Sequence, residues 1–181
     1  MGFLGRWFSH SAGLVAALVF GLLAMQAPAF TREYAAALQQ VSSDARRDID
    51  QREASARQYY AITTEQDDEL VEALKKVEPS NADTLTKSLD RTHELKSAAD
   101  VIMTSRPLLR PLVALRDALH DPAGYKRAIW ELQFQNYAIQ IDFSTAAIIY
   151  GVVGLMLGSL IAQLVLAPFY RAPRRPIYIR R

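Results

Sequence analysis

Residues 144–170 read STAAIIYGVVGLMLGSLIAQLVLAPFY and contain no charged side chain. Gln163 is the only strongly polar interruption in this run. A helix needs about 20 apolar residues to cross a hydrocarbon core roughly 30 Å thick. An uncharged run of this length is rarely the core helix of a soluble protein, so it predicts a transmembrane helix over residues 144–170.

A second apolar run lies near the N-terminus, where residues 11–29 read SAGLVAALVFGLLAMQAPA. Two interpretations fit it. A short basic start, an apolar run and the small residues Ala27-Pro28-Ala29 resemble a secretory signal with its cleavage site. The length of the run and the aromatic residues before it favour a retained anchor, so we expect a first transmembrane helix over residues 11–30.

The charges are distributed unevenly and predict the orientation of the two spans. All 19 acidic residues and 15 of the 21 basic residues lie between positions 31 and 143. Basic residues next to a span are retained in the cytoplasm. The tail after the second span carries five arginines and no acid: Arg171, Arg174, Arg175, Arg180 and Arg181. The tail could also bind anionic lipid, but its role as a topology signal already accounts for these charges.

This distribution predicts five segments in the inner membrane of a bacterium. They are a cytoplasmic N-terminus (1–10), a first span (11–30), a periplasmic helical domain (31–143), a second span (144–170) and a basic cytoplasmic tail (171–181). Aromatic residues that flank a span anchor it at the membrane interface. We expect this role for four of them: Trp7, Phe8, Phe169 and Tyr170.

The middle segment has the period of helices. Apolar residues recur at steps of three or four after the first span, which predicts one helix to about Tyr60, with a bend at Pro28. Its buried face would hold Phe30, Tyr34, Leu38, Val41, Ala45 and Ile49. Its opposite face would hold Arg46, Arg47, Asp48, Arg52 and Glu53.

Four further helices are expected before the second span. One begins at Glu65 with Thr64 as its cap and ends at Pro79, and the next starts with Ser80 and Asp83 as a capping box. The buried side of that next helix would hold Leu85, Leu89, Thr92, Leu95, Ala99 and Ile102. Short helices over 108–120 and 125–137 follow, the latter packing through Trp130 and Phe134. An extended segment over 139–143 then leads to Asp142 or Ser144 as the cap of the second span.

The predicted fold class is therefore an all-α membrane protein, with two transmembrane helices bracketing a periplasmic helical hairpin or bundle. Small residues recur every four positions in both spans and allow helix backbones to approach closely in lipid. The packing set is Gly13, Ala17, Gly21, Gly151, Gly154, Gly158 and Ala162. These faces pack either on each other within one chain or on another subunit.

Nothing in the sequence indicates catalytic chemistry. The chain has no Cys, its three His lack ligand spacing, and no phosphate-binding loop or nucleophile motif is present. The acidic cluster Asp67, Asp68, Glu69 and Glu72 suits a solvated helix N-terminus better than a cation site. We therefore expect no enzyme, no metal and no cofactor, and no nucleic-acid partner.

The stretch Ala128-Ile129-Trp130-Glu131, followed by Phe134 and by the glycines of the final span, resembles a family of uncharacterised proteobacterial membrane proteins, the domain of unknown function 2937. The resemblance implies a bacterial inner-membrane protein and supplies no activity and no site residues.

Three functional hypotheses follow. The first is a non-catalytic scaffold or accessory subunit of a larger inner-membrane assembly, with lipids and other membrane subunits or further copies of the chain as partners. The second is a periplasmic sensor or regulator that lacks its own output domain. The third is a minor transport component, which is disfavoured because the two spans contain no charged residue.

Overall fold

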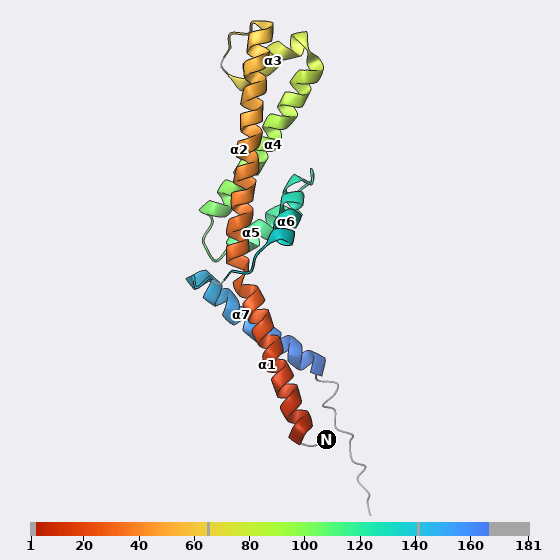
Figure 1. The fold of residues 1–181 in the computed structure, drawn as a ribbon, viewed down its shortest axis with the longest axis vertical. Helices are drawn as coiled ribbons and strands as arrows, with labels where there is room; N and C mark the ends of the chain where they lie inside the picture. Colours follow the sequence, from red (N-terminus) through yellow and green to blue (C-terminus); the bar gives the residue numbers. More distant parts are fainter. Residues whose placement is uncertain (1–2, 65, 141, 167–181) are drawn as a thin grey trace, which may run out of the picture. The chain divides into compact units, whose positions relative to one another are not determined.

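The structure is a computed structural model that describes residues 3–64, 66–140 and 142–166, with side chains from Ser11 onward. The described part is helical and contains no strand. Its helices are α1 (Phe3–Met25), α2 (Ala27–Tyr60), α3 (Asp67–Val77), α4 (Pro79–Thr104), α5 (Arg110–Leu119), α6 (Tyr125–Asn136) and α7 (Thr145–Leu166), as Figure 1 shows. The chain divides into two compact units, residues 1–29 with 139–181 and residues 30–138.

Two helical stretches are long and apolar enough to cross a membrane: Ser11–Tyr60, which begins in α1 and continues through α2, and Thr145–Val165 in α7. Only 22% of the apolar window of each helix is buried, whereas the core helix of a soluble protein is mostly buried. The all-helical fold with two candidate spans is therefore as the sequence predicts. The break after α1 lies at Gln26 and not at Pro28, because proline fits the first turn of α2 without the loss of a helical hydrogen bond.

The start of α7 confirms one of the two expected caps. The Ser144 hydroxyl accepts a hydrogen bond from the Ala147 N–H at 3.2 Å, which is the geometry of a helix N-cap. Asp142 lies one step further out, since its carboxylate accepts a hydrogen bond from the Ser144 N–H at 2.9 Å. Ser144 is the cap, and Asp142 positions it.

The second unit holds two hydrophobic clusters between α2 and the helices that follow. The first cluster contains Phe30, Tyr34, Leu38, Leu95, Ala98, Ile102, Ala114 and Ala118 together with two more alanines, and Val41 and Trp130 pack against it half-buried. The second contains Ile49, Ala56, Leu70, Leu74, Ala82, Leu85 and Leu89. The buried face predicted for residues 85–102 is confirmed at all six positions.

A buried hydrogen bond lies between the two clusters. The Ser42 hydroxyl donates it to the Thr92 carbonyl at 3.1 Å.

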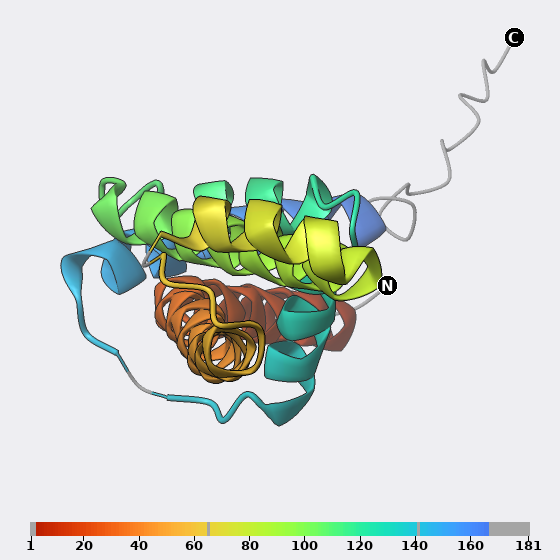
Figure 2. The same cartoon turned by 90° about the horizontal axis from the view of Figure 1, so that it is seen from above.

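An aromatic cluster lies where the chain enters and leaves this unit. The Phe30 ring packs edge-on against Trp130 at 4.7 Å and against Tyr137 at 5.4 Å between ring centroids. In the view from above, α6 lies beside α2 (Figure 2). The sequence predicts that Phe134 packs in this core, but its side chain is 71% exposed. Its ring contacts only the edge of the cluster, 6.2 Å from the Phe30 ring between centroids.

Two helix starts differ from the sequence prediction. Helix α3 begins at Asp67 with Gln66 as its N-cap, and the Thr64 hydroxyl instead donates to the Glu69 carboxylate. Helix α4 begins at Pro79, so the capping box of Ser80 and Asp83 is wrong. Proline is favoured at the first helical position because its missing N–H needs no partner there, and its ring already fixes the helical φ.

Candidate functional site: a glycine seam and two buried charge networks

Helices α1 and α7 meet through their small residues. A Cβ atom added at Gly154 would lie 2.5 Å from the Ala24 Cβ and 2.6 Å from the Phe20 carbonyl oxygen. A Cβ atom added at Gly158 would lie 2.9 Å from the Ala17 Cα. Real Cβ atoms essentially never approach heavy atoms so closely, so only glycine fits at these two positions. We call this contact the glycine seam.

The order of the contacts along the seam shows that the helices run antiparallel. Gly151 faces Met25, Gly154 faces Gly21 and Ala24, and Gly158 faces Ala17. At the far end, a Cβ atom on Gly13 would lie 3.9 Å from the Ala162 Cβ. The two small-residue rows that the sequence contains therefore lie on each other within one chain.

Although Phe20, Met25 and Leu155 also touch the seam, most large apolar side chains of both helices point outward. The exposed set includes Leu14, Val15, Leu22, Leu23, Met156, Leu160, Leu164 and Val165. Leu, Val and Met side chains on all remaining sides suit a hydrocarbon surrounding. The predicted anchors Trp7 and Phe8 have side chains outside the described part of the structure, as do Phe169, Tyr170 and the arginine tail.

A charged residue that sequence reasoning placed on the solvated face of α2 is buried. Glu53 is 2% exposed, because it continues the apolar row of Ile49 and Ala56 at steps of four and three. The same spacing is visible in the sequence and could have identified it. Its carboxylate lies 3.4 Å from the Arg57 guanidinium and 3.9 Å from that of Arg46.

Arg46 links this carboxylate to the next helix. Its guanidinium makes two hydrogen bonds to Asp67 at the start of α3, at 2.5 Å and 3.2 Å. Burial raises the pKa of Glu53, and the nearby Asp67 carboxylate adds to the rise, while Arg46 and Arg57 only partly oppose it. The Arg46 hydrogen bond lowers the pKa of Asp67. The network joins α2 to α3, and it shifts the pKa values of its two carboxyl groups in opposite directions.

A second buried charge joins three other helices. The Lys126 ammonium on α6 lies 3.0 Å from Asp117 on α5 and 3.1 Å from Glu94 on α4. Burial acts to lower the pKa of Lys126, but its hydrogen bonds to Asp117 and Glu94 outweigh burial and raise it. The Tyr34 hydroxyl donates to the Lys126 carbonyl oxygen at 3.4 Å, which ties α2 to the same point.

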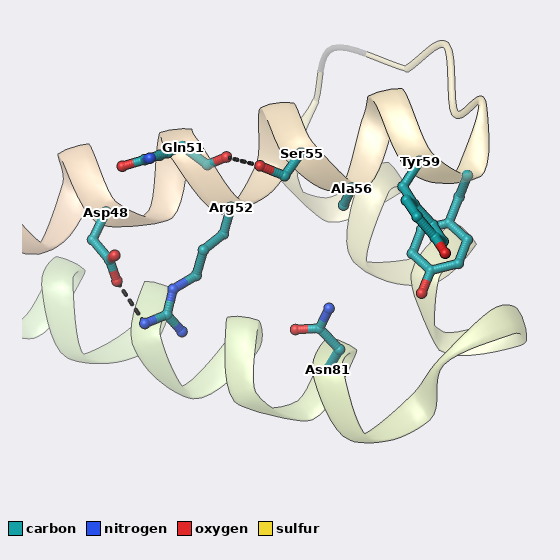
Figure 3. Close-up of a pocket in the computed structure, with 8 residues that line it drawn as sticks. Asp48, Gln51, Arg52, Ser55, Ala56, Tyr59 and Asn81 are labelled. Atoms are coloured by element: carbon teal, nitrogen blue, oxygen red, sulfur yellow. Dashed lines mark hydrogen bonds and ion pairs between the residues drawn. The ribbon is translucent and has the colours of Figure 1, made fainter.

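A groove lies between α2 and the start of α4 (Figure 3). Its volume is about 560 Å³, and it is open to solvent. The polar side chains on its wall pair locally: Arg52 lies 2.7 Å from Asp48, and the Ser55 hydroxyl donates to the Gln51 carbonyl at 2.9 Å. Within residues 3–64, 66–140 and 142–166, no group of three or more His, Asp or Glu side chains could hold a metal ion.

A family model described as "Protein of unknown function (DUF2937)" matches residues 10–175. The chain belongs to this family. The match covers both candidate spans and the whole of residues 30–138, so the family resemblance carried by the Trp130-Glu131 pair and the glycine-bearing span is confirmed. Neither the comparison with curated proteins nor the comparison with solved structures found a match.

The seam predicts that alanine substitutions at two glycines of this helix pair lower the free energy of unfolding by very different amounts. The Gly154→Ala substitution should lower the free energy of unfolding by about 1–3 kcal/mol, because the new methyl group overlaps backbone and Ala24. The matched control, Gly13→Ala, meets only ordinary van der Waals contact at 3.9 Å and should change stability by less than about 0.5 kcal/mol. Unfolding in mixed micelles, followed by far-UV circular dichroism, measures both. Equal losses for the two variants would contradict the seam.

The raised pKa of Glu53 predicts a specific pH dependence. A carboxyl group whose pKa is higher in the folded state stabilises the fold below its ordinary value of 4.5, and this stabilisation is lost as pH rises through the folded pKa. Asp67 has the opposite sign, but its stabilisation is lost only as pH falls below its ordinary value of 3.8. As pH rises from 5 to 8, the Tm of the Glu53→Gln variant should therefore fall by less than the Tm of the parent protein.

Thermal melts of the detergent-solubilised chain measure this difference, and each kcal/mol corresponds to about 2–4 °C at this chain length. The control is Asp48→Asn, which removes a carboxylate whose side chain is 58% exposed and should leave the pH profile unchanged. An identical decline in the parent and the Glu53→Gln variant would show that the buried carboxyl group has no such role.

Proposed function

We propose that this protein is a non-catalytic scaffold or accessory subunit of a larger assembly in the bacterial inner membrane. One observation carries the proposal: the glycine contacts and the buried charges both connect one helix of the protein to another. The seam joins α1 to α7, the Glu53 network joins α2 to α3, and Lys126 joins α4, α5 and α6. A structure organised in this way is suited to holding a fixed shape for a partner.

The anchor supports a location in the membrane. The outward side chains of α1 and α7 are large and apolar, and the arginines after position 170 favour a cytoplasmic tail. Both ends would then be cytoplasmic, and residues 31–143 would be periplasmic. Backbone contact at Gly154 and Gly158 closes the space between the two spans, which disfavours a transport path within one chain.

The helical unit supports a role in contact with another protein. Helix α2 has 34 residues and is therefore about 50 Å long, and α3 and α4 brace its second half through the cluster around Leu70 and Leu74. Tyr59, which is 84% exposed, and Arg52 both line the groove at this end (Figure 3). Exposed Tyr and Arg side chains carry much of the binding energy in protein interfaces.

Site-specific photo-cross-linking in native membranes tests the proposal. A photoreactive phenylalanine in place of Tyr59 should yield one dominant adduct with a second polypeptide, and Arg52→Ala in the same chain should reduce its yield. The matched control places the same amino acid at Met156, an exposed position of α7 that should give no adduct of that mass.

The location is tested on the same membranes with Ser80→Cys, since the parent chain has no Cys. A membrane-impermeant maleimide should label this position from outside the inner membrane. Labelling only after lysis would overturn the topology. The absence of any Tyr59 adduct, with the protein present at its normal level, would overturn the scaffold.

A further inference from the structure

Helix α5 carries its large apolar side chains on the outside. Leu109, Leu112, Leu115 and Leu119 are between 44% and 74% exposed, and we call them the leucine row. The fully buried residues of α5 are instead small, Pro111, Ala114 and Ala118, and Val113 packs half-buried against the same core. In a water-soluble domain leucine is among the residues most often buried, so this arrangement indicates that another apolar phase covers the row.

The leucine row lies in a basic stretch of a unit that is acidic as a whole. Residues 101–120 contain three Arg and one Asp, whereas the rest of 30–138 contains 12 basic and 17 acidic residues. The one acid, Asp117, is paired with Lys126 at 3.0 Å. Arg106 and Arg116 are exposed, and neither has an acidic partner within 4 Å among the residues that the structure describes. Leucine side chains flanked by arginine fit a boundary at which an apolar phase meets a negatively charged surface.

Chain connectivity brings this helix close to such a boundary. Ala114 and Ala118 of α5 belong to the same hydrophobic cluster as Phe30, and Figure 1 shows α5 beside the lower part of α2. Phe30 is five residues after Met25, the last residue of α1, and five residues span at most about 18 Å. Any bilayer that surrounds α1 is therefore near the cluster that holds α5.

We propose that α5 is an interfacial helix whose leucine row lies in the headgroup region of an anionic lipid bilayer. The inference rests on the membrane anchoring in the proposed function, and it assigns a lipid-binding surface to the helical unit itself. Amphipathic helices bind membranes by burying an apolar face at the boundary between headgroups and acyl chains, while basic side chains attract anionic lipid. The row contains only leucine and no aromatic residue, unlike the centre of a typical protein interface.

Spin labelling of the full chain in lipid vesicles tests this surface. The parent protein has no Cys, so Leu115→Cys and Leu119→Cys each give one labelled site. Leu160→Cys on α7 serves as the control for lipid exposure, and Ser80→Cys as the control for water exposure. In vesicles of phosphatidylglycerol and phosphatidylcholine, the ratio of oxygen to nickel-chelate collisions at positions 115 and 119 should approach that at position 160. The ratio should shift towards that at position 80 in pure phosphatidylcholine, or when Arg106 and Arg116 are both replaced by Gln.

The outcomes separate the two proposals. A ratio at positions 115 and 119 equal to that at position 80 in the anionic vesicles, with position 160 in lipid, overturns the lipid-binding surface and leaves the anchor intact. Dipolar broadening at positions 115 and 119 would show that a second copy of the chain covers the row, which also overturns it. A water-exposed label at position 160 would overturn the membrane anchoring itself.

Discussion

The pairing of the two spans depends on the approach of two helix backbones at Gly154 and Gly158. Helices in lipid gain no hydrophobic free energy by associating, so close packing of small residues must hold them together. Here the approach is so close that a methyl group at either glycine would overlap Ala17, Phe20 or Ala24. With the small residues on the inside, most large apolar residues of both spans face outward. One constraint thus fixes the pairing of the spans and the character of their outer surface.

In the helical unit, pairs of charged side chains join the helices, as the glycine contacts do between the two spans. Burial of Glu53 and of Lys126 is costly unless each finds partners, since an unpaired charge in a core is strongly destabilising. Lys126 takes its partners, Asp117 and Glu94, from two other helices. Glu53 pairs with Arg46 and Arg57 of its own helix, and Arg46 connects this network to Asp67 on α3. Each network therefore connects neighbouring helices, and removing one partner would leave an uncompensated buried charge.

The sequence was sufficient to predict the two apolar helices, the helical middle and the buried row from Leu85 to Ile102, because each depends on local periodicity. It failed at Glu53, where hydropathy suggested a solvated face and only the register of Ile49 and Ala56 revealed burial. It also misplaced the starts of α3 and α4, because Thr64 and Ser80 are both good caps and the outcome depended on tertiary contacts and on Pro79. Both rows of small residues are visible in the sequence, but only the structure shows which residue of one row faces which residue of the other.

Disulfide formation across the seam tests the central claim most directly. The Gly13 and Ala162 side-chain positions are 3.9 Å apart, which matches the usual Cβ to Cβ distance of a disulfide. The double variant Gly13→Cys, Ala162→Cys should oxidise within one chain and run as a monomer on a non-reducing gel, while Leu14→Cys with Ala162→Cys should remain reduced. A disulfide-linked dimer, or equal oxidation of both pairs, would show that the small-residue rows do not pack on each other within one chain.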